Sequence, residues 1–327
     1  MDAQDGELPP SDKSRRHEDA LPYRLAAIRE CFEESGILLA TSASKPSDLI
    51  ELSDEETEGG RKAVHDQSIS FENWLRKHDA VPDIDGLIPF TRWLTPASIP
   101  KRYTTQMYVY FLPVESKAGI SIAKLPLLDK ESASEQSDHI EPLSDETPAG
   151  EDAEVDFSMK SKGDKPKHVP TPDGGLEHTT AHFLYAREWL DMSRKREIVL
   201  FPPQFILLWL IDPFLTPPAP GIQRLSTATL LEQRQKLRMW IETDGSPSWG
   251  EKCISPDAIK KVKNQYMIMG LDQPGPELEG TSRKGDEERV VKVVLDKEIE
   301  RGRQRPRPVE VCFRKDILGE HGKLAKM

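Results

Sequence analysis

The chain has 327 residues, of which 36% are hydrophobic and 31% are charged, and its formal net charge is -11. The hydrophobic fraction is low for this length, so we expect sizeable stretches to lie outside the core. An acidic chain is a poor candidate for nucleic-acid binding, which needs clustered Lys and Arg. No run of about 18 apolar residues occurs, so we expect no membrane span and no membrane partner.

The chain has three cysteines, Cys31, Cys253 and Cys312, which lie far apart in the sequence. Because no C-x-x-C pair is present, the spacing indicates neither a zinc site nor a disulfide framework. This cysteine usage fits a reducing compartment. The polar, acidic start of the chain does not read as a secretory signal.

The first predicted element is a helix that begins at Pro22, after a polar loop over residues 1–20. Apolar residues recur there at helical spacing, at Leu25, Ile28 and Phe32. Gly36 is a good helix stop. Further along, the pattern predicts an extended segment at 37–39, a loop or linker at 41–66, a helix that includes Phe71, Trp74 and Leu75, and a strand over 103–112.

Residues 129–167 are acidic, rich in Ser and poor in aromatic residues, which predicts a disordered insert. Regular elements are expected again after it. They are a strand over 175–183, helices over 186–196, 204–211 and 229–241, and strands over 290–295 and 309–313.

Three carboxylates lie close together on the first predicted helix. Glu30, Glu33 and Glu34 are at positions i, i+3 and i+4, so a helix places them on one side. Clustered carboxylates repel one another unless a cation lies among them, and Mg²⁺ and Mn²⁺ prefer oxygen ligands of this kind. The alternative is an ordinary solvated acidic face.

The nine residues RECFEESGI, at positions 29–37, resemble the second half of the Nudix box, R-E-U-x-E-E-x-G-U, where U is apolar. Residues 23–28, 93–96 and 198–204 are similar to segments of the coenzyme A diphosphatase-like branch of that family, which includes peroxisomal members. The resemblance covers roughly residues 20–40, 68–115 and 170–212.

The resemblance implies an α/β fold, a Nudix-like α/β/α sandwich with a mixed sheet. It also implies hydrolysis of a nucleoside diphosphate linked to another group, with Mg²⁺ or Mn²⁺ as cofactor and coenzyme A or its acyl esters as substrates. Carried over by motif position, Glu30, Glu33 and Glu34 would be metal ligands. Arg29 would orient them, and Arg29, Glu30 and Glu33 would form the catalytic set.

The first half of the box departs from the family pattern. It expects Gly at position 15 and Glu at position 21, where this chain has Arg15 and Leu21. Glu18 or Asp19 is a candidate replacement for the missing acid. The fold is therefore expected to be incomplete at its N-terminus, and a second reading stays open: a catalytically inactive Nudix scaffold that serves as a binding or interaction module.

The expected organisation is a Nudix-like domain over 1–243, with the partial box at 21–40, followed by a C-terminal extension over 244–327. Glu177 is a further candidate metal ligand, with an exposed strand residue as the alternative. The final Ala325, Lys326 and Met327 resemble the Ser-Lys-Leu peroxisomal address, which predicts a peroxisomal import receptor as partner. The expected location is the peroxisome, and otherwise the cytoplasm.

Overall fold

The computed structural model describes residues 17–99, 101–114, 183–219, 225–262, 265–294 and 309–318. The chain divides into two compact units. The first comprises Met1–Arg29, Pro82–Val114 and Leu184–Met327, and the second comprises Glu30–Val81 and Glu115–Phe183. The division falls inside helix α1 (Leu21–Ser35), directly after Arg29.

The first unit contains a mixed sheet of order β5-β4-β6. Strand β4 (Ile88–Leu94) pairs antiparallel with β5 (Thr104–Val109) and parallel with β6 (Cys253–Ile254). The register of β4 shifts between Pro89 and Thr91. This irregularity lies at Pro89, which cannot donate a main-chain hydrogen bond to a ladder.

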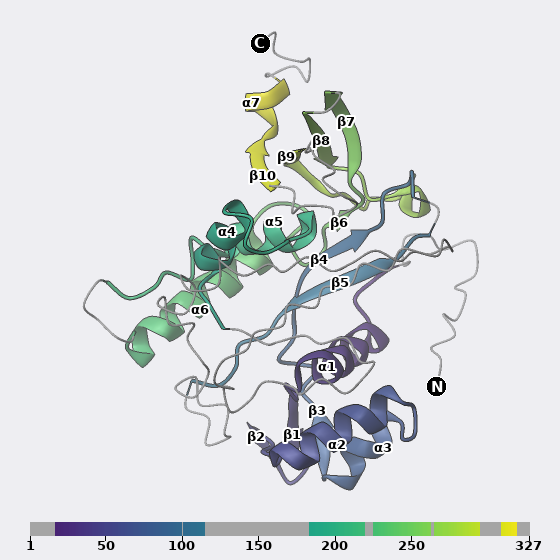
Figure 1. Ribbon diagram of the computed structural model, residues 1–327, viewed down its shortest axis with the longest axis vertical. Helices are drawn as coiled ribbons and strands as arrows, with labels where there is room; N and C mark the ends of the chain where they lie inside the picture. The colour runs from purple at the N-terminus through teal and green to yellow at the C-terminus, as the bar shows by residue number, and fades with distance from the viewer. Residues whose placement is uncertain are drawn as a thin grey trace, which may run out of the picture. The chain divides into compact units, whose positions relative to one another are not determined.

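Three helices pack against one face of this mixed sheet (Figure 1). They are α4 (Ala186–Arg194), α5 (Pro202–Ile211) and α6 (Thr227–Thr243). Helix α5 begins with two prolines, whose fixed φ suits a first helical turn. The buried core here combines side chains of β4 with those of the three helices, including Phe90, Trp93, Leu190, Phe205, Leu237 and Ile241.

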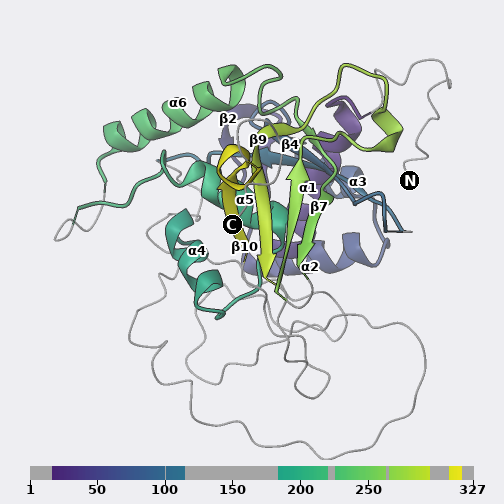
Figure 2. The same cartoon turned by 90° about the horizontal axis from the view of Figure 1, so that it is seen from above.

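A second sheet of the first unit is antiparallel, in the order β10-β9-β8-β7. Its strands are β7 (Asp257–Val262), β8 (Tyr266–Leu271), β9 (Asp286–Val294) and β10 (Val309–Phe313), with a short 3-10 helix, η2 (Pro276–Leu278), between β8 and β9. The short helix α7 (Arg314–Leu318) follows β10. Figure 2 shows β10 beside α5, and the Trp209 and Phe313 rings meet there edge to face at 6.4 Å.

The second unit contains a small sheet of order β2-β1-β3, with β1 (Ala40–Ser42), β2 (Lys45–Leu49) and β3 (Ala80–Pro82). Two helices lie between β2 and β3 in the chain, α2 (Asp54–His65) and α3 (Phe71–Lys77). Phe32, near the end of α1, stacks on Trp74 with ring centroids 4.5 Å apart. This aromatic contact anchors α1 to α3.

The α/β class and the mixed sheet agree with the expectation from the sequence. The helices expected around Leu25, Phe71, Trp189, Phe205 and Leu237 are all present. The prediction of a loop at 41–66 was wrong, because β1, β2 and α2 occupy that stretch. Ser53 and Glu56 form a capping box that starts α2, a signal the composition of the segment obscured.

Some expectations remain predictions. The acidic insert at 129–167 and all but the last residue of the strand expected at 175–183 lie outside the described residues. The domain boundary after residue 243 also stays a prediction, although β6, from beyond it, pairs with β4. In the described parts of the chain, no helix is long and apolar enough to cross a membrane.

Candidate functional site

Residues 29–37 fold as the end of α1 and the turn after it. Ile28 and Phe32 are fully buried and hold one side of the helix in the core. Glu30 and Glu34 are exposed, and Glu33 is half-buried, so the carboxylates occupy the less buried side. The helix ends at Gly36, whose φ of 75° lies in the left-handed region, where glycine carries no steric penalty.

The buried arginine Arg61, from α2, binds the main chain at the end of α1. Its Nε donates to the Glu33 carbonyl oxygen at 2.9 Å, and its Nη2 donates to the Glu34 carbonyl oxygen at 3.0 Å. The third donor, Nη1, pairs with the Glu58 carboxylate at 2.6 Å. A cation at this place complements the negative end of the helix dipole and satisfies two carbonyls that have no helical partner. Arg61 therefore fixes the backbone that carries Glu33 and Glu34.

The metal expected from the sequence matches the type of donor atom that the three glutamates offer, but not the arrangement of their side chains. Carboxylate oxygens are the ligands that Mg²⁺ and Mn²⁺ prefer. Over the described ranges, however, no group of three or more His, Cys, Asp or Glu side chains is arranged to hold a metal ion. Glu30, Glu33 and Glu34 are thus not assembled as a ligand set, and their assignment as ligands, with Arg29 as the orienting residue, stays a prediction.

Of the two candidate replacements for the missing upstream acid, Asp19 is engaged elsewhere. It accepts from Arg24 Nη2 at 2.6 Å and from the Tyr108 hydroxyl at 2.6 Å. Burial and this hydrogen bond to Asp19 raise the pKa of Tyr108 well above its ordinary value. The other expected site positions, Glu177 and residues 325–327, lie outside the described residues.

Residues 29–37, the box-like segment, have Cys31 at their first apolar position. Burial raises the pKa of its thiol, an effect that the Ser35 hydroxyl partly offsets. The Ser35 hydroxyl also donates to the Cys31 carbonyl oxygen at 2.5 Å. Cys31 is half-buried, and a thiol with a raised pKa is mostly protonated near neutral pH and is then a poor nucleophile.

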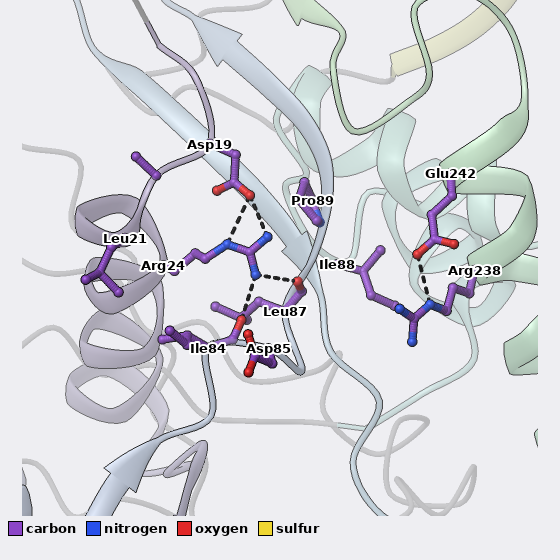
Figure 3. Close-up of a pocket in the computed structure, with 11 residues that line it drawn as sticks. Asp19, Leu21, Arg24, Ile84, Asp85, Leu87, Ile88, Pro89, Arg238 and Glu242 are labelled. Atoms are coloured by element: carbon purple, nitrogen blue, oxygen red, sulfur yellow. Dashed lines mark hydrogen bonds and ion pairs between the residues drawn. The ribbon is translucent and has the colours of Figure 1, made fainter.

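A pocket of about 500 Å³ lies in the first unit, between the start of α1, the beginning of β4 and α6 (Figure 3). Its volume is in the range of small-molecule sites. Arg24 lies at one side, where it pairs with Asp19 and also donates to the carbonyl oxygens of Ile84 and Leu87. At the other side Arg238 and Glu242 of α6 form an ion pair of 2.9 Å. Both arginines thus have carboxylate partners.

One buried charge was not foreseen from the sequence. Arg92, on β4, is 2% exposed, and its guanidinium carbon lies 4.3 Å from the centroid of the Tyr23 ring. Successive residues of a strand face opposite sides, so Arg92 points away from the core that Trp93 enters. Tyr23 therefore places the first turn of α1 on the second face of the mixed sheet. A charged residue inside the apolar run 88–94 was the signal that could have found it.

Residues 9–121 match the family model described as the NUDT19 Nudix domain. The matched stretch contains the box-like segment at 29–37, the paired strands β4 and β5, and Arg92. No match to this chain was found among curated proteins or solved structures.

Proposed function

We propose that the chain is a Nudix hydrolase, because residues 9–121 match the family model described as the NUDT19 Nudix domain. It would hydrolyse the diphosphate linkage of coenzyme A-like or other nucleoside diphosphate-linked substrates, with Mg²⁺ or Mn²⁺ as cofactor. A divalent ion bound near a diphosphate polarises it and lowers the pKa of a bound water. This chemistry is the reason why a carboxylate-rich helix matters to the proposal.

The observation that carries the proposal is the fold of residues 29–37. Glu30, Glu33 and Glu34 lie on the less buried side of α1, opposite the fully buried Ile28 and Phe32. The segment then leaves the helix at Gly36, as the box pattern requires. The carboxylates are therefore accessible to solvent on a helix whose opposite side is fixed in the core.

Arg61 contributes to the same arrangement through the main chain of Glu33 and Glu34. It holds the carbonyl oxygens of Glu33 and Glu34, so the backbone at the carboxylates is rigid. A ligand set on a rigid element loses less conformational freedom when it binds an ion. Arg61 is a positioning residue in this proposal.

The test is to incubate the full chain with coenzyme A and Mn²⁺ and to measure release of adenosine 3′,5′-bisphosphate. We expect release by the wild-type protein and a loss of about a hundredfold or more in the Glu33→Gln variant, because the metal loses a charged ligand. Glu72→Gln, at an exposed position of α3, is the matched control and should keep full activity. If neither coenzyme A nor an acyl ester is cleaved, the hydrolase proposal fails.

A second candidate function is an inactive Nudix scaffold that binds its ligand without cleaving it. Two observations favour it: Leu21 stands where the box expects a glutamate, and no metal-holding group occurs among the described residues. The two candidates differ in one experiment. Coenzyme A that binds with micromolar affinity but yields no product in Mn²⁺ would support the scaffold.

The proposed location is the peroxisome, through recognition of Ala325, Lys326 and Met327 by an import receptor. The test is to follow a fluorescent protein fused to the N-terminus of the full chain. The fusion should collect in peroxisomes, and a variant without the last three residues should stay in the cytosol. An unchanged distribution would remove this part of the proposal.

A further inference from the structure

Arg92 is a buried cation with unused hydrogen-bond donors. Its side chain is 2% exposed, and neither Nη1 nor Nη2 has a hydrogen-bond partner among the described residues. Buried polar groups are nearly always paired, and an unpaired buried charge is among the most expensive features a fold can carry. An exception of this kind calls for a ligand that completes the pairing.

The surroundings of the Arg92 guanidinium lack a balancing negative charge. Burial disfavours its charge most. The groups that favour the charge are the phenol of Tyr23, which is also within hydrogen-bonding reach, the thiol of Cys253 and the phenol of Tyr108, and no carboxylate is among them. The neighbouring Arg24 differs, because Asp19 neutralises it at 2.6 Å.

The shape of the guanidinium restricts the missing anion. Its fork of donors matches two oxygens of one phosphate or carboxylate, and an arginine makes such bidentate contacts better than any other side chain. The proposed function supplies a substrate with a diphosphate linkage. A phosphate group is therefore the anion that fits both the donor geometry and the proposed chemistry.

Tyr23 covers the Arg92 guanidinium with its ring. Its ring stacks on Arg92 at 4.3 Å, and its hydroxyl is 3.3 Å from Nδ1 of His17. The pocket of about 500 Å³ is lined by Leu21 and Arg24 of the same first turn of α1, while Tyr23 and Arg92 are not among its lining residues (Figure 3). Tyr23 is only half-buried, so its ring can rotate without opening the core.

We propose that Arg92 binds a phosphate group of the substrate, and that Tyr23 moves off the guanidinium to admit it. This inference rests on the proposed function for the identity of the anion. It adds a binding residue outside the box-like segment, on β4 rather than on α1. It also explains why a strand that is otherwise apolar keeps a charge.

The first experiment measures pyrophosphate binding to the full chain by calorimetry in EDTA, so that no metal and no turnover contribute. Wild-type protein should bind, and Arg92→Gln should weaken binding at least tenfold, because it keeps a polar side chain but neither the charge nor the guanidinium fork. Arg92→Lys should fall between the two, since it keeps the charge but not the fork. Arg194→Gln, at an exposed arginine of α4 that pairs with Asp191, is the control and should bind as wild type does.

The second variant is Tyr23→Ala, which removes the cover and should strengthen pyrophosphate binding severalfold. It also decides the matter if the Arg92 variants fail to fold. Pyrophosphate binding that is absent in wild type, unchanged in Arg92→Gln or unchanged in Tyr23→Ala overturns the inference.

Coenzyme A turnover separates this inference from the proposed function. If wild-type protein cleaves coenzyme A and Arg92→Gln shows the same KM, the hydrolase stands and the role of Arg92 falls. If pyrophosphate binding depends on Arg92 and no cleavage occurs, the phosphate site stands and the hydrolase falls.

Discussion

Arg61 and Arg92 are buried to almost the same extent, at 5% and 2% exposed, but their surroundings differ. In the second unit, Arg61 places its three donor nitrogens on two carbonyl oxygens and one carboxylate. In the first unit, Arg92 lies under an aromatic ring, with both terminal nitrogens unpaired among the described residues.

This contrast distinguishes a buried arginine that stabilises the fold from a buried arginine that binds a ligand. Burial alone does not distinguish the two arginines, whereas the accounting of their donors does. The hydrogen bonds of Arg61 offset the free-energy cost of burying it, so its loss should unfold part of the chain. Arg92 lacks such hydrogen bonds, so its loss should weaken phosphate binding and leave the free energy of unfolding largely unchanged.

The largest expected effect tests this comparison directly. Arg61→Met should lower the free energy of unfolding by about 3 kcal/mol, because it leaves two carbonyl oxygens of α1 without their donor. Arg92→Met should leave that free energy unchanged or raise it by about 1 kcal/mol, because it removes an unpaired buried charge. Urea unfolding of both variants is the measurement. Equal losses of stability would erase the distinction.

A smaller effect is expected at the two glycines before Arg61. A Cβ at Gly60 would collide with the ring of Trp74, whereas a Cβ at Gly59 would meet nothing within 4 Å. Gly60→Ala should therefore destabilise by about 2 kcal/mol through overpacking. Gly59→Ala, its matched control in the same helix, should stabilise by up to about 1 kcal/mol through helix propensity. Thermal unfolding of the two variants is the measurement. A lower stability of Gly60→Ala alone would support the role of α2 in positioning Arg61.

The smallest effect concerns the phenols of the first unit. Burial and hydrogen bonds to Asp19 and Asp83 raise the pKa values of Tyr108 and Tyr110. The native state thus keeps protons that the unfolded chain releases above about pH 10, so stability should fall as pH rises past that value. Tyr108→Phe should make the fall shallower, measured by urea unfolding between pH 8 and 11. A slope that is the same in the variant would contradict this reading of Tyr108.

Much of the fold followed from the sequence where the apolar spacing was regular. The helix around Leu25, Ile28 and Phe32 ended at Gly36 as expected, and the strand expected at 309–313 has those bounds in β10. Helix α2 was missed because its acidic first turn and paired glycines resemble a linker. The Ser53–Glu56 capping box is visible in the sequence. The reason for Gly60 is not, because it lies in the tertiary packing: the Trp74 ring leaves no room for a Cβ there.

The site was predictable only in part. The positions of Glu30, Glu33 and Glu34 on one helix follow from their spacing. The role of Arg61 does not, because its partners are main-chain oxygens of a helix 27 and 28 positions away. The charge of Arg92 within its strand was visible in the sequence, but its unpaired hydrogen-bond donors were not, since they are a property of the tertiary structure.

The affinity of the full chain for Mn²⁺, measured by calorimetry, tests whether the glutamates of α1 bind a metal ion. If Glu30, Glu33 and Glu34 form the metal site of a Nudix hydrolase, wild-type protein should bind the ion. Glu33→Gln and Glu34→Gln should each weaken that binding by about tenfold or more. Glu55→Gln, at an exposed glutamate of α2, should leave it unchanged. Mn²⁺ affinity that is the same in all four proteins, or absent in wild type, would contradict the account.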